Sequence, residues 1–459
     1  MARSSRNAIL IVSVLIGMFT FLQARHAEAV PSFARQTGMS CNICHTAFPE
    51  LTPFGRHFKL TGYSISKSEK LYEFPPPLAG MLQLSFTHTN KAQPRGAVDD
   101  NWATHVTSSD NNIINVPQQA SIFYGGKIYD HLGGLVQGTV DGASNTFFLD
   151  NTDLRYANNT TVAGKDLIYG LTINNNPTVQ DVWNTTPAWG FPYAASSVAP
   201  TPAAGTVIDG GLGQQVGGIG AYAYWNNLIY GEVAVYRTAK NGITEPLGAG
   251  TTTDTVVHGA VPYWRIALQH QRGKHSLELG TYGLYAKISP EGRTSGPVDK
   301  FTDIALDAQY QYIGKKHLLS AQTTWIHENQ DWDASFPSGN TAKQSSHLNT
   351  FKANVNYYYN SHLGKLGGTV AYFSTTGPGD SLLYAPDPVD GSRTGSPNSS
   401  GFILELDYLR LEITQFLSLK ASLQYTLYTK FNGAHSNYDG FGRNASDNNT
   451  LYLLVWLML

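Results

Sequence analysis

The chain has 459 residues, with 31 Lys and Arg against 33 Asp and Glu. Only 14% of its residues are charged, against about 25% in an average soluble domain. A nearly neutral chain without a long basic run excludes a typical nucleic-acid-binding protein. The mean hydropathy of −0.23 excludes a protein built from many membrane-spanning helices, and two cysteines in the whole chain exclude a disulfide scaffold.

The first 29 residues have the features of a Sec signal peptide. Arg3 and Arg6 precede an apolar run over residues 8–22, and Ala27-Glu28-Ala29 places small residues at the −3 and −1 positions of a signal-peptidase site. The apolar run is too short for a membrane-spanning helix, which needs about 20 residues. The sequence therefore predicts export, with cleavage after Ala29.

A motif for covalent haem attachment follows soon after the predicted cleavage position. The run from Cys41 through Cys44 to His45 reads CNICH and matches the pattern C-x-x-C-H. One helical turn puts both thiols on the same side, where each can bond one haem vinyl group. His45 is then carried under the iron as the proximal ligand.

Two other interpretations of the cysteine pair are weaker. A structural zinc site needs four ligands, and the chain has no second cysteine pair. A dithiol oxidoreductase needs a thioredoxin-like βαβ context, which the surrounding sequence does not show. We therefore expect one covalently bound c-type haem, held by Cys41, Cys44 and His45.

The segment around the motif, residues 30–77, is expected to be a small α-helical cytochrome segment. It has two predicted short helices, near 40–46 and 53–61, with Thr52 and Pro53 at the start of the second helix and Gly62 at its end. A segment of this size buries little surface by itself. The rest of the haem's cover must therefore come from elsewhere in the chain.

Residues 78–459 are predicted to form an all-β transmembrane barrel of about 16 antiparallel strands. Runs of about ten alternating residues are separated by turns or polar loops, which is typical of outer-membrane barrels. In one run, Phe351, Val355 and Tyr357 alternate with Asn354 and Asn356. The strands are placed near residues 80–90, 119–129, 132–142, 147–158, 165–174, 215–226, 228–237, 260–270, 273–287, 300–313, 316–329, 348–360, 363–374, 401–412, 415–429 and 448–459.

The predicted connections alternate between short turns and long polar loops. Short turns such as 130–131 and 314–315 are expected in the periplasm, and long loops are expected outside the cell. This pattern places both ends of the barrel domain on the periplasmic side. The long loops are predicted near 91–118, 175–214, 238–259, 288–299, 330–347, 375–400 and 430–447.

The residues around the haem motif resemble a known family. The runs 31–38 (PSFARQTG) and 49–56 (PELTPFGR), with Phe58-Lys59 and Gly62-Tyr63, are similar to the fused monohaem cytochrome–porins. These are the outer-membrane iron(II)-oxidising cytochromes of iron-oxidising bacteria. The resemblance is specific over about residues 31–90 and rests beyond that on length and architecture. Cys41, Cys44 and His45 match the haem motif of that family.

The resemblance implies an outer-membrane electron conduit, surrounded by outer-membrane lipid. Extracellular iron(II) is oxidised at the haem, and the electron passes to a periplasmic c-type cytochrome or another soluble electron carrier. This activity is that of an iron(II) oxidase. The haem segment is expected on the periplasmic side or within the lumen, where it closes the barrel. Two alternatives stay open: a conduit that serves another donor or exports electrons, and a solute porin with a haem-bearing plug.

The remaining site residues are candidates from position alone. Met81 shares the lumen face of the first strand with Gln83 and is one candidate for the distal iron ligand; His57 is its rival, and an open site is the third possibility. Arg56 and Lys59 are candidate partners of the haem propionates, or part of a solvated basic helix face. The lumen carboxylates Asp303, Asp307, Glu405 and Asp407 either guide cations inward or form ordinary polar lining.

Overall fold

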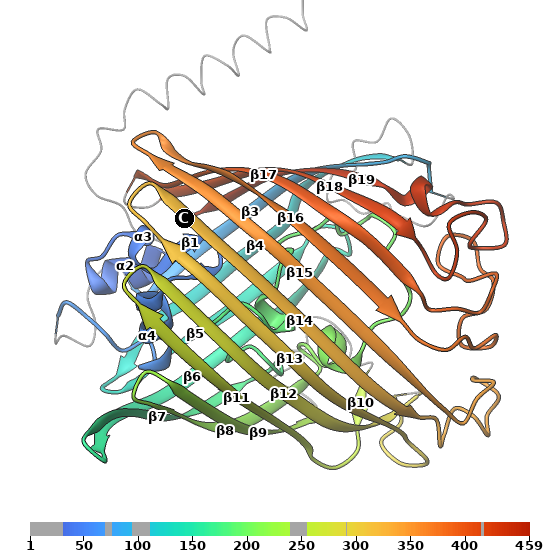
Figure 1. Cartoon of the computed structure of the whole chain (residues 1–459), viewed down its shortest axis with the longest axis horizontal. Coiled ribbons are helices and arrows are strands. Elements are labelled where there is room, and N and C mark those ends of the chain that lie inside the picture. Colours follow the sequence, from blue (N-terminus) through green and yellow to red (C-terminus); the bar gives the residue numbers. More distant parts are fainter. Residues whose placement is uncertain (1–30, 69–75, 94–110, 239–254, 291, 415–416) are drawn as a thin grey trace, which may run out of the picture.

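The computed structural model describes residues 31–68, 76–93, 111–238, 255–290, 292–414 and 417–459. The predicted signal peptide lies outside these residues, as do parts of the predicted loops at 91–118 and 238–259. Within the described residues, sixteen long strands form a closed antiparallel barrel (Figure 1). No helix among these residues is long and apolar enough to cross a membrane.

Each of the sixteen predicted strands is present, and the all-β barrel is confirmed. The largest difference in position is at β4, which begins at Asn112 rather than near residue 119. The barrel strands are β3 (Leu78–Thr89), β4 (Asn112–Tyr129), β5 (Leu132–Asp141), β6 (Thr146–Val162), β7 (Lys165–Asn174), β8 (Val216–Trp225), β9 (Ile229–Thr238), β11 (Val261–Arg272), β12 (His275–Ser289), β13 (Asp299–Ile313), β14 (His317–Asp331), β15 (Ser345–Ser361), β16 (Gly364–Thr376), β17 (Ser399–Thr414), β18 (Leu417–Lys430) and β19 (Thr450–Met458).

The first and last barrel strands close the sheet. β19 pairs antiparallel with β3, with Met458 opposite Met81 and Thr450 opposite Thr89. A two-residue strand, β10 (Val256–Val257), adds to the end of β12. We call the end of the barrel where β3 begins and β19 ends the terminal end, and the opposite end the loop end; they lie left and right in Figure 1.

Alternation along the strands separates an apolar outer face from a polar lumen. On β17, Leu404 and Leu406 are 47% and 64% exposed, whereas Glu405 and Asp407 between and beside them are buried. The same alternation on β3 buries Met81 and Gln83 on the lumen side, as predicted. A closed barrel with an apolar exterior is the architecture of barrels that span outer membranes.

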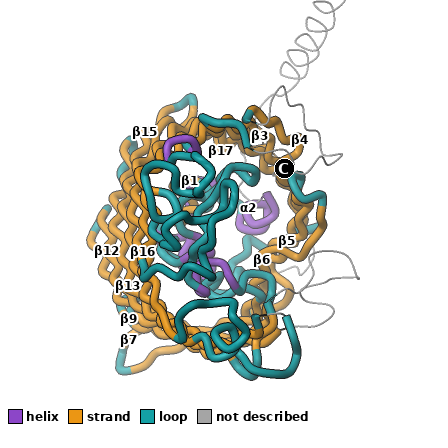
Figure 2. Tube along the Cα trace, turned by 90° about the vertical axis from the view of Figure 1, so that its right-hand side faces the viewer, coloured by secondary structure: helices purple, strands orange, loops and turns teal. Residues whose placement is uncertain are grey.

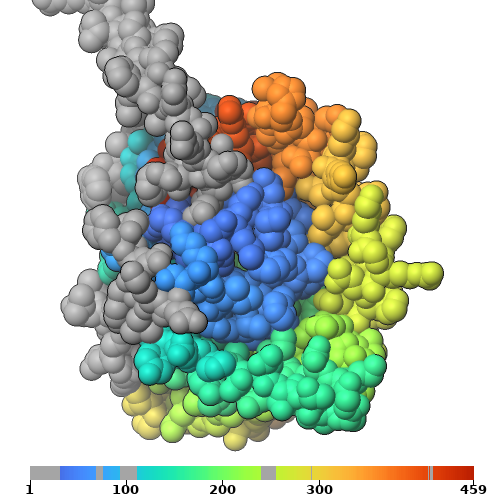
Figure 3. All heavy atoms as spheres, turned by 90° about the vertical axis from the view of Figure 1, so that its left-hand side faces the viewer, coloured from blue at the N-terminus to red at the C-terminus, as the bar shows by residue number. Residues whose placement is uncertain are grey.

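The N-terminal segment, residues 31–68, which we call the plug, fills the mouth of the barrel at the terminal end (Figure 3). It contains α2 (Pro31–Thr37), α3 (Cys41–Cys44), β1 (His45–Ala47), β2 (Glu50–Leu51) and α4 (Pro53–Leu60). The helix predicted near 40–46 is shorter than expected, because its last residues pair with β2 as a small hairpin. The sequence did not predict α2.

The second predicted helix is present as α4, with the expected start and end. The Thr52 hydroxyl caps it by accepting a hydrogen bond from the Gly55 N–H at 3.2 Å. Gly62 follows the helix with a φ of 70°, a left-handed conformation that favours glycine.

Hydrogen bonds to the inner wall hold the plug in place. The Arg56 guanidinium donates to Gln311 of β13 at 2.6 Å and to Ser276 of β12 at 3.0 Å. On other sides of the lumen, the Tyr63 hydroxyl donates to Asp153 at 2.7 Å, and the Lys365 amine donates to the Thr46 carbonyl at 2.6 Å. The plug is therefore fixed to strands on several sides of the barrel.

The long connection between β7 and β8, residues 175–215, lies inside the barrel rather than outside it (Figure 1), and Figure 2 shows loop and helical segments within the ring of strands. We call it the inner loop; it contains η1 (Pro187–Trp189) and η2 (Val207–Gly211). Its Trp183 indole donates to Gln269 at 2.7 Å, and its Asp181 pairs with Arg265 at 3.2 Å. The prediction of an external loop here is wrong, because the polar residues of the loop bond to a polar lumen wall instead of to solvent.

Most of the lumen carboxylates singled out in the sequence are already paired. Asp307 forms an ion pair with Arg265 at 2.6 Å, and Lys420 contacts Glu405 at 3.0 Å and Asp407 at 3.4 Å. All of these side chains are almost completely buried. They stabilise the wall and the inner loop, so the polar-lining interpretation fits them better than cation guidance.

Gly55 allows α4 to pass close to the haem motif. A Cβ at this position would collide with the backbone oxygen of Cys44 and contact the Leu51 side chain at 3.1 Å. Overpacking of this kind typically costs about 1–3 kcal/mol. We expect Gly55→Ala to speed tryptic cleavage within the plug by about 5- to 150-fold, because the plug opens more often.

Gly231→Ala is the matched control for this prediction, because a Cβ at Gly231 meets nothing within 4 Å. Equal cleavage rates in Gly55→Ala and the parent chain would show that α4 tolerates the added methyl group.

Candidate haem site

The haem motif lines a cavity inside the barrel. The cavity has a volume of about 340 Å³ and lies between the plug, the inner loop and the seam of β3 and β19. Pockets for cofactors and small ligands typically measure about 300–1,000 Å³. Cys41, Cys44 and His45 all contribute to its wall, so the structure brings the three predicted haem residues to one cavity.

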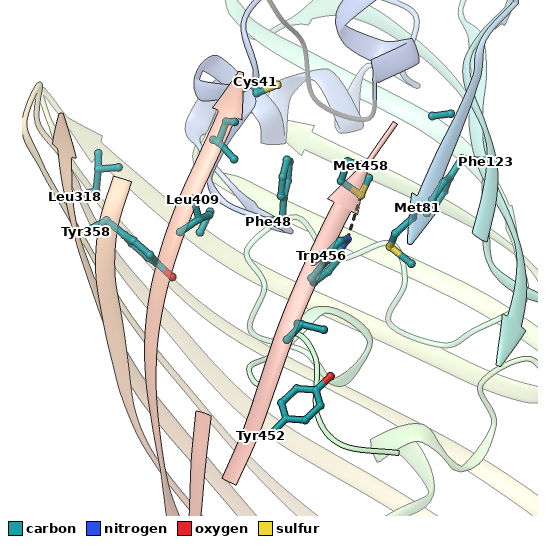
Figure 4. Close-up of a cluster of buried hydrophobic side chains, with 14 residues drawn as sticks. Cys41, Phe48, Met81, Phe123, Leu318, Tyr358, Leu409, Tyr452, Trp456 and Met458 are labelled. Atoms are coloured by element: carbon teal, nitrogen blue, oxygen red, sulfur yellow. Dashed lines mark hydrogen bonds between the residues drawn. The ribbon is translucent and has the colours of Figure 1, made fainter. Parts of the chain in front are cut away.

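The wall around the motif is apolar. Cys41 packs in a buried cluster with Phe48 of the plug and with side chains of β3, β4 and β19 (Figure 4). Met81, Phe123 and Trp456 of that cluster also line the cavity. The inner loop contributes Trp189. This combination of apolar and aromatic groups suits the flat apolar face of a porphyrin and excludes water from it.

The two cysteines are thiols rather than halves of a disulfide. Cys41 is buried and Cys44 is half-buried, at the two ends of the single turn of α3. Burial raises the pKa of the Cys44 thiol to about 11, so this thiol stays protonated at neutral pH. Reactive dithiols have a depressed pKa, so the environment of Cys44 disfavours a dithiol oxidoreductase.

His45 is in the form that binds a metal. Burial, with the nearby Lys365 charge as the second cause, lowers the pKa of its imidazole to about 4. The ring is therefore neutral at pH 7, as an iron ligand must be. Its Nδ1 atom is buried and makes no hydrogen bond within the described part of the chain. The residues present thus fit a c-type haem with His45 as proximal ligand.

The structure separates the two predicted candidates for the distal ligand. Met81 lines the cavity from β3 and is 6% exposed. His57 is exposed on α4 and is not among the cavity-lining residues that the structure describes. Distal ligation stays a prediction, and Met81 is the better placed of the two.

Met458 is a cavity residue that the sequence analysis missed. It lies opposite Met81 in the pairing of β19 with β3, and its sulfur accepts a hydrogen bond from the Trp456 indole at 3.1 Å (Figure 4). The signal was available in the alternation of the last strand, which points Trp456 and Met458 to one face. This alternation points to the cavity only when the pairing of β19 with β3 places that face beside Met81.

Arg56 and Lys59 are both buried, at 2% and 6% exposure, so the solvated helix face considered for them is wrong. Arg56 is engaged with the barrel wall, as described above. Lys59 lines the cavity; its amine donates to the carbonyls of Val179 and Asp181 at 2.7 and 2.8 Å. Pairing with haem propionates stays a prediction, and Lys59 is the better placed of the two residues.

The buried amine of Lys59 predicts a specific pH dependence of stability. Burial first, and then the Arg155 charge, lowers the pKa of Lys59 from 10.5 to about 7. Between these two values the unfolded chain holds a proton that the folded chain lacks, so stability rises with pH. We expect the melting temperature of the parent chain in detergent, minus that of Lys59→Met, to increase as the pH rises from 7 to 10. A difference in melting temperature that does not change with pH would contradict this.

Comparisons with known proteins bear on the barrel alone. No protein-family model matches the chain, and no curated protein matches it. Among solved structures, outer-membrane expressed OmpT of Vibrio cholerae is 9% identical, with a TM-score of 0.43, over 85% of this chain and 99% of that one.

Two further solved structures give a similar result. The outer membrane channel DcaP of Acinetobacter baumannii is 12% identical, with a TM-score of 0.44, over 83% of this chain and 96% of that one. The anion-selective porin from Comamonas acidovorans is 12% identical, with a TM-score of 0.43, over 83% and 98%. With TM-scores below 0.5 these likenesses carry no argument about the cavity, and the barrel itself rests on the strand pairing described above.

Proposed function

We propose that the chain is an outer-membrane electron conduit in which a single c-type haem inside the barrel takes electrons from extracellular iron(II). The observation that carries this proposal is that Cys41, Cys44 and His45 line one largely apolar cavity within the lumen. A haem attached there lies inside the protein wall that crosses the membrane. The electron then passes to a soluble carrier in the periplasm.

The residues of the site have distinct roles in this proposal. The chemistry that a c-type haem supplies when bound is a reversible one-electron couple, which matches the iron(II)/iron(III) couple. Cys41 and Cys44 would hold the group covalently, and the neutral His45 would bind its iron. Met81 as distal ligand raises the potential, which suits a weak reductant such as iron(II). The aromatic wall keeps water away.

The charges at the terminal end support a soluble acceptor there. The turns around this mouth expose Lys165, Arg272, Lys274, Lys315 and Lys316, while Asp130 and Asp166 are the exposed acids of the same turns in the described residues. This excess of cations favours an acceptor protein with an acidic surface, since complementary charge steers association. Short turns and both ends of the barrel domain lie at this mouth, as expected for the periplasmic side.

Iron(II) is the donor that the sequence resemblance favours. A conduit that serves another donor or exports electrons uses the same haem site, and a solute porin uses the same barrel. The haem potential separates iron(II) oxidation from electron export, since a strongly negative potential favours export.

The direct test is anaerobic reduction of the haem by iron(II). The purified protein in detergent is oxidised, mixed rapidly with iron(II), and followed at the haem α band. We expect reduction of the whole haem population. A c-type spectrum that dithionite reduces and iron(II) does not would overturn iron as the donor. The absence of any c-type spectrum would leave the barrel as a solute porin.

A further inference from the structure

Two more cavities continue from the haem cavity towards the loop end. A middle cavity of about 110 Å³ shares Asn184, Pro187, Gly190 and Pro192 of the inner loop with the haem cavity. An outer cavity of about 460 Å³ shares Phe191, Pro192, Asp209, Thr350, Lys352 and Asn354 with the middle one. Since neighbouring cavities are lined by the same side chains, the three follow one another along the inner loop.

The order of the cavities follows the barrel axis. The haem cavity includes Met458, the last residue of β19, at the terminal end. The outer cavity includes Thr375 and Tyr428, which lie near the loop ends of β16 and β18. The middle cavity shares lining residues with both and is the smallest of the three, with Thr, Asn and Gln side chains in its wall.

An ion pair spans the junction between the middle and outer cavities. Lys352 of β15 contacts the carboxylate of Asp209, in η2 of the inner loop, at 2.6 Å. Both residues line both cavities. The two side chains are 40% and 18% exposed, whereas Arg265 and Lys420 and their partners are 4% exposed or less. The Lys352–Asp209 pair is therefore the hydrated one among these lumen ion pairs.

We infer that the three cavities form one passage by which a small hydrated ion reaches the haem cavity from the loop end, with Asp209 and Lys352 as its selectivity gate. The passage runs past the inner loop through polar groups. As applied to iron(II), this inference rests on the proposed function and deepens it, because the donor then comes to the haem rather than reacting at the outer surface.

The two gate residues have opposite effects on a passing ion. The Lys352 ammonium repels cations from the small section, and the Asp209 carboxylate offsets that charge. Removing Lys352 leaves an uncompensated carboxylate in the passage, and removing Asp209 leaves an uncompensated ammonium. Because charged groups in a narrow path select by sign, the two single substitutions move the selectivity in opposite directions.

The test is the rate at which two small reductants of opposite charge, iron(II) and the dithionite anion, reduce the haem of the full chain. We expect Lys352→Met to be reduced faster by iron(II) and more slowly by dithionite than the parent chain, and Asp209→Asn to show the reverse. Lys300→Met is the matched control, since Lys300 of β13 and Asp333 of the loop after β14 form a pair at the same distance of 2.6 Å, with a lysine of nearly the same exposure. No opposite effects on the two reductants would overturn the passage.

A second readout separates this inference from the proposed function. With iron(II) as reductant, we expect the haem of Lys352→Met to be reduced about tenfold faster than that of Asp209→Asn, as electrostatic steering of a cation predicts. Opposite effects of the two substitutions on reduction by dithionite, without haem reduction by iron(II), would support the passage and reject iron as donor. Haem reduction by iron(II) at equal rates in the two variants would support the donor and reject the passage.

Discussion

Replacement of both Cys41 and Cys44 by serine is expected to remove all covalently bound haem while the barrel stays folded. Serine is nearly the same size as cysteine, and the plug is held mainly by contacts of other residues, such as Arg56, Tyr63 and Lys365. Without the thiols no thioether bond to the porphyrin can form. The measurement is haem staining of the chain after denaturing electrophoresis, where only covalent haem stays with the protein.

Folding of this variant is checked independently of the haem. Folded barrels migrate differently from boiled ones on gels, so heat-modifiable migration reports the barrel alone. Haem stain that persists on the double variant would rule out Cys41 and Cys44 as the attachment residues. If both the stain and the folded band are lost, the same two measurements are repeated on Cys41→Ser and Cys44→Ser, each of which keeps one thioether.

Replacement of Met81 by leucine is expected to lower the haem potential by more than about 100 mV, since axial ligands set haem potentials over roughly 0.8 V. Leucine conserves most of the side-chain volume in this buried wall, so the change removes the sulfur and little else. The near-infrared charge-transfer band of a methionine-ligated ferric haem is expected to disappear as well. A redox titration and a near-infrared spectrum provide the two readouts.

Met458→Leu is the matched control for Met81→Leu. Met458 lies opposite Met81 in the same wall and lines the same cavity. Its sulfur accepts a hydrogen bond from the Trp456 indole at 3.1 Å, whereas the Met81 sulfur has a weaker contact with the Gln83 amide at 4.0 Å. We expect this variant to keep both the potential and the band. If Met458→Leu loses them and Met81→Leu does not, the distal ligand comes from β19 instead.

The barrel could be predicted from the sequence because its signal is local and repeated. Each strand carries its own alternation, as the exposed Val355 and the buried Asn354 and Asn356 illustrate, and sixteen such strands reinforce one another. The haem motif was equally local, since three residues within one turn of chain define it. The start of α4 was predictable for the same reason, because Thr52 and Pro53 act within their own helix.

The inner loop and the anchoring of the plug could not be predicted because their partners are distant in sequence. Arg56 donates a hydrogen bond to Gln311, which is 255 positions further along the chain. No local pattern distinguishes an arginine with such a partner from one that faces solvent. The polar composition of residues 175–215 fits an external loop and a lumen loop equally well. Only the closed barrel shows that the polar wall, rather than water, satisfies these side chains.

The most direct test of the whole account is electron transfer across a membrane. The protein is placed in sealed vesicles that contain a ferric cytochrome with an acidic surface, and iron(II) is added outside without oxygen. We predict reduction of the enclosed cytochrome by the haem-loaded protein and none by the Cys41→Ser/Cys44→Ser variant. Equal reduction by the two proteins, or none by either while the haem itself is reduced, would contradict a haem-mediated conduit.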